Sequence, residues 1–255
     1  MSFEGYERVC FHVNGRDSIL ILPHHPREGN PWIWKTEFFE AFNFAERALL
    51  ENGFALAYHR VSDLYGCPDS VAMMEEFYLA CRARGLHEKP ALFGFSRGGL
   101  YACNFALTYP DQVGMLYLDA PVLDIRSWPA GRGVGVGSAS CWEECKACYG
   151  LDEESANVFA QNPLDRACEL AKSRIPILLV CGAADRVVPY EENGKPFFDR
   201  VLNGGGRIAK IVKPDCDHHP HSLYDPQPIC DFVLSCYGWN GEEGFSPAEI
   251  SQNER

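Results

Sequence analysis

The residues that most clearly point to chemistry form the pentapeptide Gly94-Phe95-Ser96-Arg97-Gly98. It matches the G-x-S-x-G pattern, in which flanking glycines allow a tight turn that presents a serine hydroxyl at the start of a helix. The helix dipole and free backbone N–H groups there favour the negative charge of acyl transfer. Because an apolar run precedes this serine and a helical pattern follows it, we predict that Ser96 is a nucleophile.

A serine hydroxyl needs a base that removes its proton and a carboxylate that orients the base. Asp185 follows an apolar run, in a loop where a predicted strand ends, and ligand sites of open α/β sheets lie at that edge. Its alternative role is that of a turn-forming or helix-capping residue. His218, His219 and His221 follow the next predicted strand, and all three are candidates for the base.

Clustered histidine and aspartate side chains also bind metals. No helical His-x-x-x-His pair occurs in this cluster, and Pro220 interrupts it, so we predict no metal. Cys141, Cys145 and Cys148 have a spacing found in iron–sulfur proteins, but on a helix they share one face, which favours a buried apolar stripe. We therefore expect no cofactor.

The elements that must position these residues alternate between β-branched or aliphatic runs and amphipathic stretches, which predicts an α/β fold with a mostly parallel sheet. The predicted strands are residues 8–13, 18–22, 54–61, 91–95, 113–118, 175–181 and 207–212. The first two flank Asn14-Gly15, which suits the turn of an antiparallel hairpin. The predicted helices are residues 35–51, 70–84, 97–108, 191–202 and 225–237.

We expect one domain over residues 1–255, because single α/β domains reach this length. Residues 121–174 depart from the alternation and contain a glycine-rich stretch, so they are predicted to form an inserted cap or lid. Residues 241–255 are polar and predicted to form a tail.

Composition excludes several classes of partner. The formal net charge of -12, with no block of basic residues, would repel nucleic acids and anionic lipid surfaces. The sequence has no apolar run long enough for a membrane span and no signal-peptide pattern, so we expect a cytoplasmic protein. The twelve cysteines are expected to be free, with several buried as small apolar residues: Cys10, Cys103, Cys181 and Cys230. The oligomeric state is not indicated.

Taken together, these residues resemble the α/β-hydrolase superfamily over nearly the whole chain. The segments PWIW (31–34), EFF (37–39), SRGGL (96–100), DAPV (119–122) and SWP (127–129) look like a branch of bacterial hydrolases. The resemblance implies the triad Ser96, Asp185 and His218, because many members continue after the catalytic histidine with a segment ending in Pro-His. It also implies two oxyanion donors, the backbone N–H of Arg97 and one from an early loop, for which we predict Trp32, with Asn30 as the alternative.

Other residues are predicted to line the substrate pocket: Trp34, Asp119 and Trp128. Aromatic walls suit a sugar ring or an aromatic acyl group, although the same side chains could instead dock the cap. The guanidinium of Arg97 could bind a substrate carboxylate or phosphate, or pair internally with Asp119 or Asp63.

The function predicted from these features is a serine hydrolase that cleaves a small-molecule ester through an acyl-enzyme, most simply a carboxylesterase. A peptidase, thioesterase or carbon–carbon hydrolase could use the same triad, since the fold does not set the substrate. The alternative class is a small-molecule receptor on a hydrolase scaffold.

Overall fold

The computed structural model describes residues 3–238, and the predicted tail at 241–255 lies outside this range. Eight strands form one sheet in the order β1-β2-β4-β3-β5-β6-β7-β8. The hairpin of β1 (Glu7–Val13) and β2 (Arg16–Leu22) is antiparallel, and β2 is also antiparallel to β4 (Ala55–His59). The remaining pairs are parallel, so the prediction of a mostly parallel sheet is confirmed.

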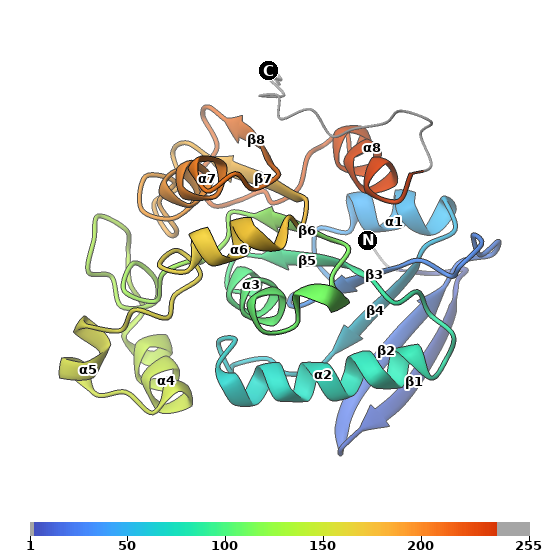
Figure 1. Cartoon of the computed structure of the whole chain (residues 1–255), viewed down its shortest axis with the longest axis horizontal. Coiled ribbons are helices and arrows are strands. Elements are labelled where there is room, and N and C mark those ends of the chain that lie inside the picture. The colour runs from blue at the N-terminus through green and yellow to red at the C-terminus, as the bar shows by residue number, and fades with distance from the viewer. Residues whose placement is uncertain (1–2, 239–255) are drawn as a thin grey trace.

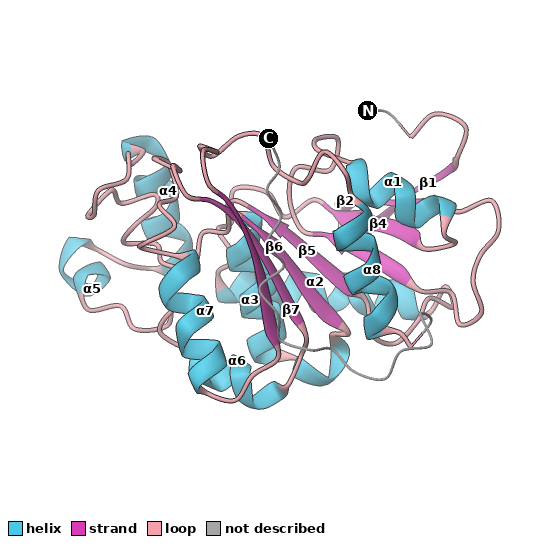
Figure 2. Cartoon of the chain, turned by 90° about the horizontal axis from the view of Figure 1, so that it is seen from above, coloured by secondary structure: helices cyan, strands magenta, loops and turns pink. Residues whose placement is uncertain are grey.

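The central strands are short and completely buried. They are β3 (Trp32–Lys35), β5 (Ala91–Phe95), β6 (Met115–Asp119) and β7 (Ile177–Gly182), with β8 (Ile208–Lys213) at the edge. Their continuous apolar sequences follow from helices covering both faces of the sheet. Figure 2 shows the twisted sheet between these helices.

Two helical layers bury the two faces. One layer contains α2 (Pro68–Arg82), α3 (Gly98–Thr108), α6 (Ala167–Ser173) and α7 (Gly194–Asn203), and the other contains α1 (Phe44–Glu51) and α8 (Gln227–Cys236). Successive residues of a strand face opposite layers. In β3, for example, Trp32 and Trp34 pack in the core beneath α2 and α3, whereas Ile33 packs in the core beneath α1 and α8.

The sequence prediction was wrong at residues 23–43. We expected a loop up to Trp34 and then a helix from Lys35, but residues 32–35 form a central strand and α1 begins only at Phe44. Between them the chain turns sharply, with positive φ angles at Phe38 (54°) and Phe42 (56°). A strand of four residues is too short for a clear alternation, which is why the pattern missed it.

The predicted cap region contains α4 (Ala139–Tyr149) and α5 (Glu153–Asn157), which lie beside the sheet in Figure 1. These helices share a small core with the loops around Ser96, including Tyr65, Val122 and Trp142. The third helix of the region, α6, instead packs against α7 and α3. It therefore serves as the helix that connects β6 to β7, and the cap as a movable unit stays a prediction.

All twelve cysteines are free, as predicted. Burial raises the pKa of the Cys103 and Cys181 thiols. Cys10 differs from the expectation, because it is exposed on β1 at the edge of the sheet. None of the described helices has the length and apolarity needed to cross a bilayer.

A buried histidine makes the stability of this core depend on pH. The ring of His59 stacks on Phe77 with centroids 5.0 Å apart, and its Nδ1 lies 2.9 Å from Ser18 Oγ. Burial, helped by Arg16, lowers the pKa of His59 from 6.5 to about 4. As the pH falls, the unfolded chain binds a proton before the folded chain does. The stability supplied by neutral His59 is therefore present above about pH 6.5 and is lost as the pH falls towards 4.

Urea unfolding between pH 7 and pH 4 tests this dependence. The free energy of unfolding is expected to fall with pH in this window, and the fall should be shallower in His59→Phe, although that variant is less stable throughout. Exposed His12, in the variant His12→Gln, is the matched control and should keep the wild-type slope. An unchanged slope in His59→Phe would contradict the expectation.

Candidate functional site

The serine of the pentapeptide lies at a sharp turn between β5 and α3. Ser96 has a φ of 50°, in the left-handed region that non-glycine residues rarely adopt. Its backbone is held there because Ser96 N donates to Asp119 O at 2.9 Å and Val122 N donates to Ser96 O at 2.8 Å. The turn places the side chain, 9% exposed, above the carboxyl end of the sheet. This is the local geometry that the sequence predicted.

Close packing explains why glycine follows at position 98. A Cβ atom on Gly98 would lie 2.9 Å from Thr36 Oγ1 and 3.3 Å from Glu37 Cβ. Thr36 Oγ1 in turn donates to the carbonyl of Gly98 at 2.9 Å. The start of α3 therefore lies directly against the loop that follows β3, and any side chain at Gly98 would push the two apart.

Ser96, Asp185 and His218 form one hydrogen-bonded chain. Ser96 Oγ lies 3.0 Å from His218 Nε2, and His218 Nδ1 lies 2.8 Å from Asp185 Oδ2. Asp185 follows β7 and His218 follows β8, so all three side chains come from the carboxyl ends of parallel strands. All three are buried. Of the three candidate histidines, His218 is the one that contacts both partners.

The second oxygen of Asp185 is also held in place. Asp185 Oδ1 accepts hydrogen bonds from the backbone N–H groups of Val187 and Val188 at 2.9 and 2.8 Å. One carboxylate oxygen thus binds the local turn and the other binds the imidazole. Asp185 thus makes both the turn-forming contacts and the contact to His218 that the sequence offered as alternatives.

The sequence did not reveal an ion pair that joins the loops of Asp185 and His218. The guanidinium of Arg186 donates to Asp217 Oδ2 at 2.6 and 2.8 Å, and the backbone N–H groups of Arg186 and His218 donate to Asp217 Oδ1. The backbone hydrogen bond from Arg186 and its guanidinium lower the pKa of Asp217 to about 2. The only sequence signal for this ion pair was that Arg186 directly follows Asp185 and Asp217 directly precedes His218.

Asp119 was predicted to line the substrate pocket, but its side chain is 1% exposed and both of its carboxylate oxygens have internal partners. Its carboxylate is buried and fully partnered, with Oδ1 2.8 Å from His221 Nδ1, and Oδ2 accepting from Tyr117 Oη at 2.6 Å and Ser222 N at 2.8 Å. Burial alone would raise the pKa of Asp119, but hydrogen bonds and charge from His221 and the nearby Lys213 lower it below its usual value. Asp119 and His221 thus form a second carboxylate–imidazole pair, with the ring of His221 4.8 Å from that of His218, centroid to centroid.

Arg97 makes an internal ion-pair network. Arg97 Nε donates to Glu37 Oε2 at 2.9 Å, and Nη1 lies 2.9 Å from Asp63 Oδ1. Asp63 was one of the two predicted partners of Arg97, whereas Asp119, the other, does not contact the guanidinium. Sequence reasoning missed Glu37, whose side chain is 1% exposed and whose Oε1 has no hydrogen-bond partner among the described residues. Burial raises the pKa of Glu37, and the guanidinium of Arg97 opposes this.

The predicted roles of Trp32 and Trp34 were also wrong. Trp32 begins β3, so its backbone lies at the amino end of that strand, away from Ser96 at the carboxyl edge. Both indoles are buried, Trp34 between Phe77 and Phe105 and Trp32 stacked on Trp34. They are core residues. The loop that follows β3 begins instead at Thr36, next to Gly98.

Trp128 lies in the region between β6 and α4 and is partly buried. Its ring lies 6.2 Å from that of Tyr65, centroid to centroid, in the small core that α4 and α5 share with the loops around Ser96. This contact favours docking of that region, and a role of Trp128 in substrate binding stays a prediction.

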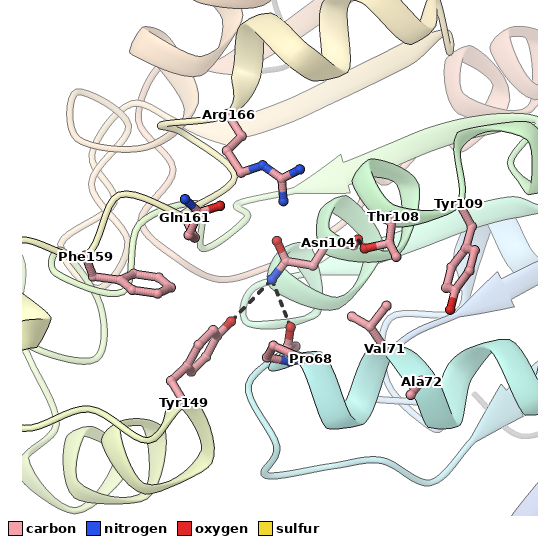
Figure 3. A pocket seen from close by; sticks show the side chains of 11 residues that line it. Pro68, Val71, Ala72, Asn104, Thr108, Tyr109, Tyr149, Phe159, Gln161 and Arg166 are labelled. Atoms are coloured by element: carbon pink, nitrogen blue, oxygen red, sulfur yellow. Dashed lines mark hydrogen bonds between the residues drawn. The ribbon is translucent and has the colours of Figure 1, made fainter.

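A cavity of about 310 Å³ lies near this region but does not include the triad. Figure 3 shows it between α2, the second half of α3, the end of α4 and the segment before α6. Asn104 lines the cavity, and its Nδ2 donates to Gly66 O and to Tyr149 Oη. Neither Trp34 nor Trp128 lines it.

Comparison with known proteins identifies the fold. No protein-family model and no curated protein matches the sequence. Among solved structures, acylaminoacyl peptidase from Pyrococcus horikoshii matches 96% of this chain with a TM-score of 0.70 and 17% identity. Puromycin hydrolase matches 98% of it with a TM-score of 0.67 and 19% identity. Dipeptidyl peptidase 4 from Porphyromonas gingivalis matches 92% with a TM-score of 0.63 and 13% identity.

This chain spans less than half the length of those three proteins, 44%, 41% and 35% respectively. At identities below one fifth, the likeness concerns the fold. The chain therefore has the α/β-hydrolase fold, as its sequence predicted.

Proposed function

We propose that this protein is a serine hydrolase in which Ser96 is the nucleophile, His218 the general base and Asp185 the residue that orients the base. The observation that carries the proposal is the continuous hydrogen-bonded chain from Ser96 Oγ through both nitrogens of His218 to Asp185. Such a chain allows the imidazole to take the hydroxyl proton, while the carboxylate stabilises the imidazolium that forms. Each partner is held in place by the turns around it.

The reaction follows from these positions. His218 Nε2 accepts the proton of Ser96 Oγ as the oxygen attacks an acyl carbonyl, and the carbonyl oxygen becomes an oxyanion. When this tetrahedral intermediate collapses, the protonated His218 donates the proton to the leaving group, and an acyl-enzyme remains. Water, deprotonated by His218, then attacks the acyl-enzyme and releases the acid, so that Ser96 regains its proton.

The oxyanion requires N–H donors beside Ser96. The backbone N–H of Arg97 is one, since it directly follows the nucleophile at the start of α3. For the second donor we replace Trp32 by Glu37, in the loop after β3. Its amide nitrogen lies 3.7 Å from the position that a Cβ on Gly98, the first residue of α3, would take, and is thus close to the turn at Ser96. The Arg97–Glu37 ion pair would hold this loop at that distance.

The substrate class that we favour is a small-molecule ester, because an ester needs no further binding elements beyond the triad and the oxyanion donors. Hydrolysis of a peptide or aminoacyl amide bond is the second candidate, favoured by the names of the structural neighbours, acylaminoacyl peptidase and puromycin hydrolase. Thioesters and carbon–carbon bonds are further acyl substrates that the same residues could cleave.

A fluorophosphonate probe, which modifies activated serines, tests the proposal. Wild-type protein is expected to be labelled, whereas Ser96→Ala and His218→Ala should not be. Replacement of the neighbouring exposed histidine, in His219→Gln, is the matched control and should leave labelling intact. Labelling that persists in Ser96→Ala would disprove the proposal, and labelling lost only in His219→Gln would assign the base to another histidine.

A panel of ester and aminoacyl-amide substrates then separates the classes. Sustained turnover of esters supports an esterase, and sustained turnover of amides supports a peptidase. A single stoichiometric burst without further release would indicate a receptor built on a hydrolase scaffold.

A further inference from the structure

Three imidazole rings lie together at the end of β8. His218, His219 and His221 each offer one ring nitrogen, and the three nitrogens lie within 4.8 Å of one another. The ring centroids are 4.8 to 5.0 Å apart, and the rings are inclined to one another by 68 to 90°. The three ring nitrogens therefore lie close together, and the rings do not stack in parallel.

Each of the three rings is held by a neighbouring group. Asp185 and Asp119 bind Nδ1 of His218 and His221, both at 2.8 Å. The ring of His219 stacks on Phe42, with centroids 5.5 Å apart and an interplanar angle of 18°. A carboxylate on the second nitrogen of an imidazole is the usual outer partner of a zinc-binding histidine, because it fixes the tautomer and makes the other nitrogen more basic.

We propose that His218, His219 and His221 form a binding site for a divalent zinc ion that inhibits the enzyme. Three histidines with an open fourth position are a known ligand set for zinc. The two buried carboxylates, Asp185 and Asp119, supply two negative charges that offset the charge of the ion. His219 is exposed, which gives the ion a route from solvent to the two buried rings.

The ligand atoms must move only locally to bind the ion. A tetrahedral ion with nitrogen at about 2.0–2.1 Å places its ligand atoms roughly 3.4 Å apart. The nitrogens here are separated by at most 4.8 Å, and all three belong to one four-residue segment that follows β8. Small rotations of exposed His219 and its neighbours thus close the site without any change in the sheet.

Inhibition follows because His218 has no free nitrogen. Nε2 is engaged by Ser96 and Nδ1 by Asp185, so an ion that takes either nitrogen breaks the triad. This consequence rests on the proposed function, whereas the ion site itself does not. Zinc would therefore be a reversible inhibitor that competes with Ser96 for Nε2 of His218 while Asp185 stays on Nδ1, and no covalent bond of the protein is formed or broken.

The variant His219→Phe tests the site, because it keeps a ring on Phe42 and removes the two ring nitrogens. His219 is not part of the triad, so labelling by the fluorophosphonate probe without metal should equal that of wild type. Zinc chloride is expected to block labelling of the wild type, and a chelator should restore it. Blocking the labelling of His219→Phe should require a zinc concentration at least about tenfold higher. His12→Gln removes an exposed histidine on β1 and should behave as wild type.

Calorimetry with zinc chloride on Ser96→Ala separates the site from the proposed activity, since it needs no turnover. One ion is expected to bind per chain. In the double variant Ser96→Ala/His219→Phe the dissociation constant for zinc should be at least about tenfold higher than in Ser96→Ala. Equal zinc affinity with and without His219 would overturn the proposal, as would the absence of binding to Ser96→Ala. If the protein binds zinc but the probe never labels the wild type, the proposed zinc site stands and the proposed hydrolase activity is wrong.

Discussion

The double variant Ser96→Ala/His218→Ala is expected to hydrolyse esters at about the rate of either single variant. Each single change should lower kcat by roughly 10⁴- to 10⁶-fold. Serine and base act as a unit, so neither contributes to catalysis once the other has been removed. If Ser96 and His218 contributed independently, the fold-losses in kcat of the two single variants would multiply in the double variant. Kinetics on an ester identified from the panel, with folding of each variant checked by thermal unfolding, measure the effect.

Arg186→Gln is the matched control for this prediction. It lies next to Asp185 and is exposed, and it contacts Asp217 but no triad atom. Its kcat should stay far above that of the triad variants. A double variant that loses much more activity than either single variant would show that Ser96 and His218 act separately, which contradicts the proposed mechanism.

The largest expected effect on stability comes from Lys35 at the end of β3. Its Nζ lies 2.7 Å from Glu46 Oε1 and 2.6 Å from Asn43 Oδ1, and both Lys35 and Glu46 are fully buried. Burial lowers the pKa of Lys35 and raises that of Glu46, and the attraction between them opposes both shifts. Lys35→Met should therefore lower the free energy of unfolding by about 3–5 kcal/mol, because it leaves a buried carboxylate without its partner.

Removing both charges should restore most of this loss. In Lys35→Met/Glu46→Leu both charges of this buried pair are gone, and apolar side chains of similar volume fill the space. Urea unfolding at neutral pH measures all three variants in parallel. The interpretation is wrong if Lys35→Met is as stable as wild type, or if the double variant is less stable than Lys35→Met.

The parts of the site that the sequence could predict are local in the chain. The turn at Ser96 is specified by an apolar strand, two glycines and a helix within about 20 residues, and the structure has each of them there. The apolar runs that end before Asp185 and His218 are β7 and β8, whose carboxyl ends meet at one edge. The catalytic roles of these residues stay predictions until the labelling is done.

The parts that the sequence did not predict depend on contacts between distant residues. β3 has only four residues and is buried on both faces, so it shows neither alternation nor a helical period. Lys35 was predicted to begin a helix, whereas it ends β3 with its ammonium group buried against Glu46, and a buried lysine is too rare for a sequence pattern to indicate it. Similarly, the Asp119–His221 pair joins residues 102 positions apart, and no local pattern reveals it.

The long sequence separations within the triad also bear on how the protein folds. Ser96 and His218 are 122 residues apart, and they meet only when β5, β6, β7 and β8 are paired in the sheet. Closing such long loops is slow, since the loss of chain entropy precedes the stabilising contacts. We therefore expect the Ser96 hydroxyl to be activated only late in folding, once the strands that carry Asp185 and His218 have paired. Recovery of probe labelling during refolding would therefore report the final pairing of the sheet.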